Sequence, residues 1–526
     1  MKRSDLINTA NIYAIAISAV AFVYRIFGIF NNHPFWVDEF STAKNARYML
    51  QYGLDLFNIQ TINPEKHNIT THALTALSFH VFGMTEGAAR LPFVVIGSLL
   101  PMTVFFLTRR LTNSATAICA SLFTLFSYTM ITWSRQARGY VILNFAILWT
   151  MYFYLGLLEK KGLNKKNIIG LSIFTLIGFL THPLYYLIVA AIGVHWIITQ
   201  RKTVFKVFKN KASYYILVPA AGVLLAVLHI QDSLRFFTTT LFGADNWWYY
   251  HSYLWRENTL ITFLGFLGLI TLFFKHRNGA MLILLYTALH WIFINYMFGH
   301  YLTKYLLPIF PLLLIGMAVA IYEFIELTIK THLPKVGFKS ILIATLPIAL
   351  SLFVISNGDK FVKKPVPYYS VNKDFREIAN IDYHQVYEII ESKGRLKDAM
   401  TAVIDTWPDR AKWYVGNGYP ALYFFKWQND SGRVSGHVKQ TKFTLENGEK
   451  ITVGRERFKF IGEAADLMRV IKKYPRGFLY IDDTTLPKDV IDFAEKNLKK
   501  ELYLEHYPLD ENPYSIWPAT LYSWGV

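Results

Sequence analysis

The sequence lacks the features of a disulfide-stabilised or zinc-binding protein. A single cysteine, Cys119, stands among 526 residues, so an internal disulfide is excluded. The zinc-binding pattern H-E-x-x-H is absent. Charged residues make up only 17% of the chain, whereas hydrophobic residues make up 53% and aromatic residues 17%. This is more apolar side chain than a soluble core needs.

The apolar residues are clustered into runs that can cross a membrane. Runs of roughly 17–22 residues recur from Leu6 to about Ser356, and each is long enough for a hydrocarbon layer of ~30 Å. The first run has no small-residue cleavage site, so we interpret it as an anchor rather than a removed signal peptide. The break at His182–Pro183 either separates two short spans or kinks one. We predict about eleven spans, near 7–29, 91–108, 114–132, 139–158, 167–182, 184–199, 213–230, 259–274, 279–297, 305–325 and 338–356.

After Asn357 the sequence is mixed and polar, and it contains no further run that could span. We therefore predict an all-α polytopic membrane domain at 1–356, with a large first outer loop at 30–90, followed by a smaller external α/β domain at 357–526. The segments expected to form strands of that domain are Thr401–Asp405, Phe478–Ile481, Glu501–His506 and Ala519–Trp524, and those expected to form helices are Arg410–Tyr414 and Lys488–Lys499. Asp482 and Asp483 indicate a turn rather than a metal site.

The net charge of +18 is explained by topology rather than by nucleic-acid binding. With Met1 inside, the predicted inner loops carry about twice as many Lys and Arg residues as the outer loops. The positive-inside rule then predicts a multi-pass protein of the cell (plasma) membrane, with a cytoplasmic N-terminus and an external C-terminal domain. The same residues favour contact with anionic lipid headgroups.

The first outer loop opens with two adjacent carboxylates, Asp38 and Glu39. Two like charges side by side raise the pKa of at least one of them, which suits a general base near neutral pH. The alternative is that both are ordinary acids at the start of a short helix beginning near Ser41, where the helix dipole favours them. The residues alone leave both interpretations open.

Later in this loop, Lys66, His67 and His72 suit recognition of a phosphate or of sugar hydroxyls. A zinc site is the less favoured alternative, because the two histidines are five residues apart and no cysteine accompanies them. They could also be plain interfacial histidines.

The order of the motifs resembles the GT-C superfamily, in particular its branch of protein O-mannosyltransferases and lipid A aminoarabinose transferases. The resemblance covers roughly residues 7–356, and one departure is that Asn68-Ile69 replaces the family's double proline. The matching motifs are Asp38-Glu39, Glu65-Lys66-His67, Phe82-Gly83, Ala89-Arg90-Leu91-Pro92, Arg135-Gln136-Ala137-Arg138-Gly139-Tyr140, Leu180-Thr181-His182-Pro183 and Lys304-Tyr305-Leu306-Leu307-Pro308.

The resemblance implies an inverting glycosyltransferase that moves one sugar, a hexose or a pentose, from a polyprenyl-phosphate donor to an acceptor hydroxyl on a lipid, glycan or protein. It implies that Asp38 is the general base, with Glu39 beside it. Cationic side chains would stabilise the charge on the leaving lipid phosphate. We expect this role for Arg138 first, then for Lys66, Lys304 and Arg90. Substrate contacts are expected from His67, His72, His182 and Tyr140.

Two structural alternatives apply to these residues. Arg138 and Arg90 could merely anchor their spans, and His182 could be a structural histidine. The sequence identifies no cofactor with certainty, and a divalent metal is left open.

Two other classes of protein share the apolar composition. A transporter or lipid-linked-sugar flippase would place ionisable residues near the membrane midplane and often contains duplicated halves. Here the charges gather on one face, and the sequence contains no evident repeat. A non-catalytic assembly or adhesion protein would not need the Asp38-Glu39 pair.

Overall fold

The computed structural model divides the chain into two compact units. The first contains Met1–Ile29, His67–Thr71 and Arg90–Tyr369, and the second contains Phe30–Lys66, His72–Ala89 and Ser370–Val526. The residues that the structure describes are 3–31, 34–52, 68–159, 164–199, 245–298, 302–333, 338–366, 383–398, 400–416, 419–425, 444–445, 452–453, 456–457, 459–482, 487–504 and 519–526.

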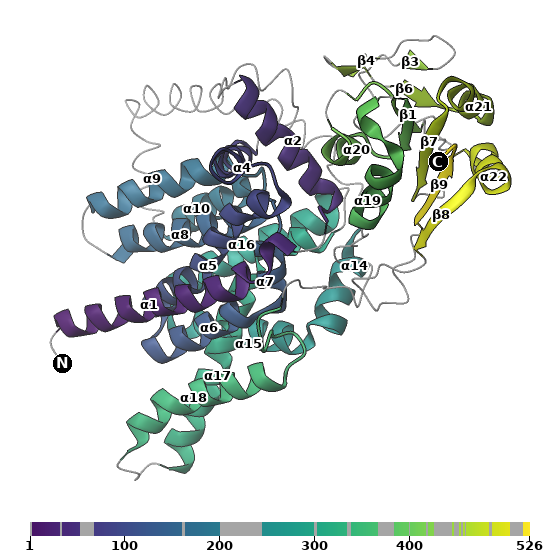
Figure 1. Cartoon of the computed structure of the whole chain (residues 1–526). Helices are drawn as coiled ribbons and strands as arrows, with labels where there is room; N and C mark the ends of the chain where they lie inside the picture. Colours follow the sequence, from purple (N-terminus) through teal and green to yellow (C-terminus); the bar gives the residue numbers. More distant parts are fainter. Residues whose placement is uncertain are drawn as a thin grey trace, which may run out of the picture. The chain divides into compact units, whose positions relative to one another are not determined.

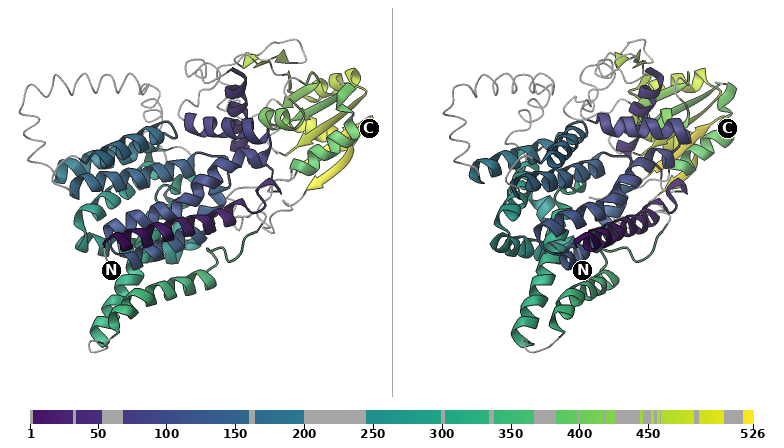
Figure 2. Two further views of the ribbon diagram at one scale, coloured as in Figure 1. Left: turned by 60° about the vertical axis from the view of Figure 1, so that its left-hand side comes forward. Right: turned by 90° about the vertical axis from the view of Figure 1, so that its left-hand side faces the viewer.

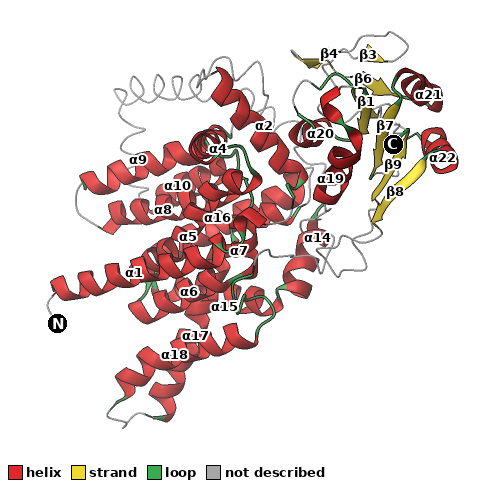
Figure 3. Cartoon of the chain, viewed as in Figure 1, coloured by secondary structure: helices red, strands yellow, loops and turns green. Residues whose placement is uncertain are grey.

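The first unit is built from helices (Figures 1 and 3). Two elements lie partly in it and partly in the second unit, namely α4 (Ile69–Phe82) and α5 (Glu86–Leu111). Its longer helices are α1 (Arg3–Ile26), α6 (Ser114–Phe126), α8 (Tyr140–Glu159), α9 (Lys165–Phe179), α10 (Tyr185–Thr199), α15 (Thr259–Lys275), α16 (Arg277–Ile292), α17 (Phe310–His332) and α18 (Lys339–Asn357). Its shorter elements are α7 (Tyr128–Ser134), α14 (Trp247–Ser252), the π-helices η2 (Tyr253–Glu257) and η3 (Phe293–Met297), and the 3-10 helix η4 (Thr303–Leu306).

Several of these helices can cross a membrane, so the protein is a multi-pass membrane protein. Among the described residues, six helices are long and apolar enough by length and composition: Thr9–Asn31, Glu86–Leu111, Tyr140–Glu159, Arg277–Met297, Phe310–His332 and Lys339–Asn357. The segments Ser114–Phe126 and Tyr185–Thr199 are apolar but shorter. Large apolar side chains are exposed on several of these helices, as expected where lipid replaces water, and they include Ile15, Phe274, Phe324, Leu327 and Phe353.

Several helices are interrupted at positions that the apolar composition of the sequence does not reveal. The predicted span 114–132 is divided at Ser127, whose hydroxyl caps α7 by accepting from the Met130 N–H at 3.4 Å. At His182–Pro183 the chain forms two helices, because Pro183 cannot continue α9. The helix before Asn258 is bent by 98° against α15. The predicted span 213–230 lies outside the described residues, so a total of eleven spans stays a prediction.

Helices α15 and α17 approach each other closely through glycine. A Cβ atom placed on Gly268 would lie 1.7 Å from the carbonyl oxygen of Gly316, and one on Gly316 would lie 2.0 Å from the oxygen of Gly265. Small residues at such crossings let the backbones pack directly, which is the usual basis of helix association in membranes. Helices α17 and α18 are also neighbours, as both views of Figure 2 show.

The second unit combines helices of the predicted first outer loop with the C-terminal segment. The loop contributes η1 (Ile29–Asn31) in part, α2 (Val37–Tyr52), most of α4 and the start of α5. The C-terminal helices are α19 (Tyr383–Gly394), η5 (Leu396–Asp398), α20 (Pro408–Tyr414), α21 (Ala464–Lys473) and α22 (Lys488–Asn497). Every strand among the described residues lies after residue 400 (Figure 3). The domain boundary at 357 stays a prediction.

A seven-stranded mixed sheet forms the centre of the C-terminal domain. Its strand order is β3-β6-β2-β1-β7-β9-β8, parallel from β3 to β7 and antiparallel at β7–β9 and β9–β8. These strands are β1 (Thr401–Asp405), β2 (Leu422–Phe425), β3 (Thr444–Leu445), β6 (Lys459–Ile461), β7 (Arg476–Ile481), β8 (Lys499–Leu504) and β9 (Ala519–Trp524), and a separate pair is β4 (Thr452–Val453) with β5 (Glu456–Arg457). The predicted small α/β fold of this domain is therefore confirmed. Helices α20 and α22 correspond to the two predicted helices, although α22 ends at Asn497 and Lys499 already belongs to β8.

Both faces of this sheet are covered by helices, which explains why its central strands β1, β2 and β7 are almost entirely buried. Ile404 and Leu479 pack on one face with Leu467 of α21 and Val490 of α22. On the other face, the Tyr480 ring lies 6.4 Å from the ring of Tyr383 in α19. This alternation along β7 follows from the two-residue period of a strand.

Candidate functional site

The acid pair lies in the first turn of α2, which begins four residues earlier than predicted. Glu39 is fully buried, and its carboxylate accepts a hydrogen bond from the Trp36 N–H at 3.0 Å. The Glu39 N–H in turn donates to the Trp36 carbonyl at 2.7 Å. This reciprocal arrangement resembles a capping box and fixes the start of the helix. Asp38 is half-buried, so it is the more accessible member of the pair.

His72 is buried and contacts the same helix. Its Nε2 lies 3.4 Å from Nδ2 of Asn45 in α2. This contact joins α4 to α2, so His72 helps to position α2. Whether it also meets substrate stays a prediction. Lys66 and His67 lie outside the described residues.

Lys304, a predicted donor-phosphate residue, comes together in the first unit with Tyr140 and His182, two predicted substrate contacts. The ring centroids of Tyr140, the first residue of α8, and of His182, in the turn between α9 and α10, are 5.0 Å apart. The Lys304 ammonium lies 6.0 Å from the Tyr140 ring centroid and 5.3 Å from that of Tyr305. We call Tyr140, His182, Lys304 and Tyr305 the headgroup cluster.

The headgroup cluster is electrostatically suited to an anion. Lys304 is only 4% exposed, and the attraction between a buried ammonium and a negative charge is stronger than it would be in water. Both tyrosine rings add cation–π attraction. His182 is half-buried, and its Nδ1 accepts from the Leu184 N–H at 3.2 Å, which fixes the ring orientation.

The loops that carry this cluster are packed against each other without spare room. A Cβ atom on Gly139 would lie 2.6 Å from the Thr71 hydroxyl and 3.1 Å from the Thr181 methyl carbon. The Thr70 N–H donates to the Leu180 carbonyl at 3.0 Å. Gly139, which precedes Tyr140, therefore has no room for a side chain.

The arginines near these loops have different surroundings. Arg135 is buried, and its Nη1 donates to the carbonyls of Arg25 at 2.7 Å and Phe27 at 2.8 Å. It therefore caps the end of α1, a role that the sequence did not indicate. Arg138 follows in the same loop and is half-buried, whereas Arg90 in α5 is fully buried. Of the three, Arg138 is the most accessible.

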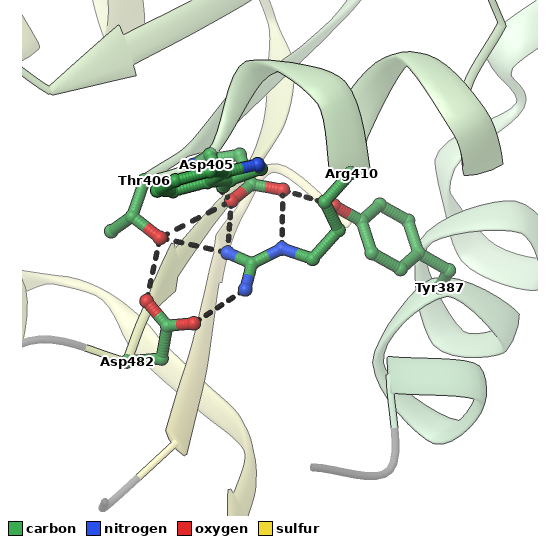
Figure 4. A network of polar contacts seen from close by, with 6 residues as sticks. Tyr387, Asp405, Thr406, Arg410 and Asp482 are labelled. Carbon is green, nitrogen blue, oxygen red and sulfur yellow. Dashed lines mark hydrogen bonds and ion pairs between the residues drawn. The ribbon is translucent and has the colours of Figure 1, made fainter. Parts of the chain in front are cut away.

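A second polar centre lies at the carboxyl ends of β1 and β7 (Figure 4). Arg410 is buried and pairs with Asp405, which it contacts through Nη2 and Nε, and with Asp482, at 2.5 Å through Nη1. Thr406 donates to Asp482 at 2.5 Å, and the Tyr387 hydroxyl donates to Asp405. Although burial alone would lower the pKa of Arg410, the two carboxylates raise it well above its ordinary value.

This network is internally satisfied, and its arginine lies between two aromatic rings. The guanidinium carbon is 4.6 Å from the ring centroids of both Tyr383 and Tyr480. We interpret it as the element that joins α19 and α20 to the sheet. Asp482 takes part in this ion network rather than in a simple turn, and Asp483 lies outside the described residues. In the part of the chain that the structure describes, no group of three or more His, Cys, Asp or Glu side chains is placed to hold a metal ion.

Comparisons with known proteins agree with the predicted superfamily. The family model "Dolichyl-phosphate-mannose-protein mannosyltransferase" matches residues 66–229. A search of curated protein sequences found no match. ArnT from Cupriavidus metallidurans, solved bound to undecaprenyl phosphate, has 13% identity and a TM-score of 0.55, with 99% of this chain and 98% of ArnT covered.

The oligosaccharyltransferase of Archaeoglobus fulgidus is a second structural match. Its apo form has 11% identity and a TM-score of 0.53, with 90% of this chain and 69% of that chain covered. The oligosaccharyltransferase AglB from the same organism was solved with an inhibitory peptide and a dolichol-phosphate, and it has 10% identity and a TM-score of 0.50, with 89% of this chain and 69% of that chain covered. The structural matches show that the chain has the fold of these two membrane glycosyltransferases, as the motif order predicted.

Proposed function

We propose that the chain transfers a single sugar from a polyprenyl-phosphate donor to an acceptor hydroxyl, with inversion at the anomeric carbon. The observation that carries the proposal is the headgroup cluster, in which Lys304, Tyr140 and His182 meet within one unit. A buried ammonium flanked by aromatic rings and a histidine is suited to a phosphate joined to a sugar.

The structural neighbours support a lipid-phosphate donor. ArnT was solved with undecaprenyl phosphate, and AglB with dolichol-phosphate. Both ligands carry one phosphate on a long polyprenol. For this chain, we propose that Arg138 and Lys304 contact the phosphate oxygens, with Lys66 and Arg90 as further candidates.

The proposed reaction needs a base and a means to stabilise the leaving group. The Asp38 carboxylate accepts the proton of the acceptor hydroxyl while the hydroxyl oxygen bonds to the anomeric carbon from the face opposite the phosphate. The bond from the anomeric carbon to the phosphate oxygen breaks, and its electron pair leaves with the lipid phosphate. Negative charge on the phosphate increases in the transition state, so fixed cations there lower the barrier.

We propose that the acid and the headgroup cluster act at the outer face of the cell membrane. The excess of Lys and Arg in the predicted inner loops supports this orientation. The acceptor is then an extracytoplasmic lipid, glycan or protein.

The test incubates the purified protein with a panel of radiolabelled polyprenyl-phosphate sugars, both hexoses and pentoses, and a membrane extract as the source of acceptor. Release of free polyprenyl phosphate together with transfer of label to an acceptor would support the proposal. Asp38→Asn supplies the inactive control, and Lys165→Gln, at the exposed start of α9, supplies a matched active control. Movement of intact donor across vesicles without cleavage would instead identify a flippase.

A further inference from the structure

The second unit contains an open pocket of about 330 Å³ that the reaction described above does not use. This volume falls within the range of small-molecule sites, about 300–1,000 Å³. The pocket is formed entirely within one unit, by residues of the first outer loop and of the C-terminal domain. Its lining includes Phe30, Arg47, Met84, Glu86, His384 and Trp413.

Glu86 holds two groups of the C-terminal domain in place. Its Oε1 accepts from the Tyr414 hydroxyl at 2.5 Å, and its Oε2 lies 3.1 Å from Nε2 of His384. The Glu86 side chain is 13% exposed and that of His384 is 41% exposed. Glu86 and His384 therefore present polar groups in fixed positions to a ligand. The Tyr414 hydroxyl and the His384 ring already compensate part of the charge on the Glu86 carboxylate.

Arg47 brings a cation to the same pocket. Its guanidinium carbon lies 5.5 Å from the ring centroid of Trp413, and its Nε is buried with no hydrogen-bond partner among the described residues. No ion pair to Arg47 is found in that part of the chain. Burial removes the Arg47 guanidinium partly from water and lowers its pKa from the ordinary value. A bound anion would compensate for this loss of hydration.

The position of Arg47 is well defined by its surroundings. The Trp413 ring is held between Phe35, at 4.9 Å, and Phe79, at 6.0 Å between ring centroids. Helix α20, which carries Trp413 and Tyr414, is fixed to the sheet by the buried Arg410 network. A preorganised cation beside a fixed carboxylate and an apolar rim favours a small, partly charged ligand with hydroxyl groups.

We propose that this pocket binds an anionic sugar residue of the acceptor. Arg47 would meet its phosphate or carboxylate group, the Glu86–His384 pair would meet its hydroxyls, and Phe30 and Met84 would cover its apolar face. The identification of the ligand as acceptor rests on the proposed transferase function. The pocket itself is a separate binding site, whose occupancy does not require Asp38 or the headgroup cluster.

The test measures equilibrium binding to the purified full-length protein without donor. Mannose 6-phosphate, glucuronate, uncharged methyl mannoside and inorganic phosphate serve as probes in calorimetric titrations. We expect at least one anionic sugar to bind about tenfold or more tightly than methyl mannoside and than inorganic phosphate, because a charge-assisted contact of this kind is worth roughly ten- to a hundredfold in affinity. Which anionic sugar binds distinguishes a phosphate ligand from a carboxylate ligand.

Variants then assign the binding to the pocket. Arg47→Gln should remove the preference for the anionic sugar, and Arg47→Lys should restore part of it. Arg469→Gln, which removes an exposed arginine paired with Asp466 on α21, is the matched control and should bind as wild type does. Wild-type binding by folded Arg47→Gln would overturn the proposal, as would equal affinity for inorganic phosphate and for both anionic sugars, or no binding by any probe.

The outcome is independent of transfer. Asp38→Asn should bind the same probe with wild-type affinity, because the pocket contains no part of the proposed base. If transfer is absent in wild type but the anionic sugar still binds through Arg47, the proposed function fails and the pocket stands. If transfer occurs but Arg47→Gln changes no binding, the pocket proposal alone fails.

Discussion

Arg138 is the more accessible arginine of its loop, since Arg135 is buried and holds the end of α1. We predict that Arg138→Gln weakens binding of a non-hydrolysable polyprenyl-phosphonate sugar by about ten- to a hundredfold, as expected for loss of a charge-assisted contact. Arg138→Lys keeps the charge but loses the planar fork, so its loss should be smaller. Binding is measured on detergent-purified protein.

A control for this prediction is Lys166→Gln, at the exposed start of α9, which should leave analogue binding unchanged. If Arg138→Gln is folded and binds the analogue as wild type does, Arg138 only anchors its span, and Lys304 or Lys66 takes the phosphate role.

Glu501 provides a pH-dependent test of the C-terminal domain. Burial alone would raise its pKa, but hydrogen bonds from Lys393, Lys499 and Ser523 lower it to about 2. A carboxylate with a lowered folded-state pKa stabilises the protein above its unfolded pKa of roughly 4.3, and this contribution is lost as pH falls toward 2. Glu501→Gln should therefore lower the melting temperature at pH 7, and the difference from wild type should close between about pH 4.5 and 2.

The expected shift at pH 7 is a few degrees, because about 1 kcal/mol moves the melting temperature of a 150–250-residue domain by roughly 2–4 °C. Glu391→Gln, at an exposed position of α19, should show no comparable difference. A difference between Glu501→Gln and wild type that grows as the pH falls would contradict the assigned ion pairs.

Helices α15 and α17 illustrate how one element depends on another. Gly268 faces the backbone of Gly316, so even one added methyl group must separate the two helices. We predict that Gly268→Ala lowers the free energy of unfolding in detergent by about 1–3 kcal/mol, the usual cost of overpacking. Gly193→Ala is the matched control, since a Cβ there would meet nothing within 4 Å. Equal stability of the two variants would show that α15 and α17 are not in direct backbone contact.

Whether a segment forms a helix or a strand was predictable where one local sequence pattern determines it. Apolar length predicted the helices around 91–108 and 338–356, and short β-rich runs predicted β1, β7 and β9. The break at Ser127 was not predictable in this way, because it depends on a local cap and on pairing with Phe361 within an otherwise apolar run. The start of α2 was predicted near Ser41 because Asp38 and Glu39 were considered only for their charge. In the structure the Glu39 carboxylate caps the helix by accepting from the Trp36 N–H, so α2 begins at Val37.

The candidate site was only partly predictable for a related reason. Motif order indicated Lys304 as a phosphate contact and Tyr140 and His182 as substrate contacts before their proximity was known. The pocket beside Arg47 gave no sequence signal, because its residues are far apart in the chain. Glu86 and Tyr414, for example, are separated by 328 positions. Contacts of that kind arise from the tertiary fold and have no local pattern.

For the whole molecule, the orientation in the membrane decides whether the proposed donor can be reached. In a Cys119→Ala background, we predict that a cysteine at Glu495 reacts with an impermeant maleimide on intact cells and that one at Lys165 does not. Both positions are exposed in the structure, and both should react after permeabilisation. Labelling of Lys165→Cys alone on intact cells would place the C-terminal domain in the cytoplasm and remove the argument for an outer-face reaction.

The central claim is that the chain breaks the bond between a sugar and a polyprenyl phosphate with Asp38 as the base. The most direct measurement is single-turnover transfer from a radiolabelled polyprenyl-phosphate sugar by wild type and by Asp38→Asn, with binding of the non-hydrolysable analogue measured on the same preparations. We predict equal analogue binding and a fall in the transfer rate of at least ~10²-fold, the lower range for loss of a general base. An Asp38→Asn variant that transfers sugar at the wild-type rate would contradict the account.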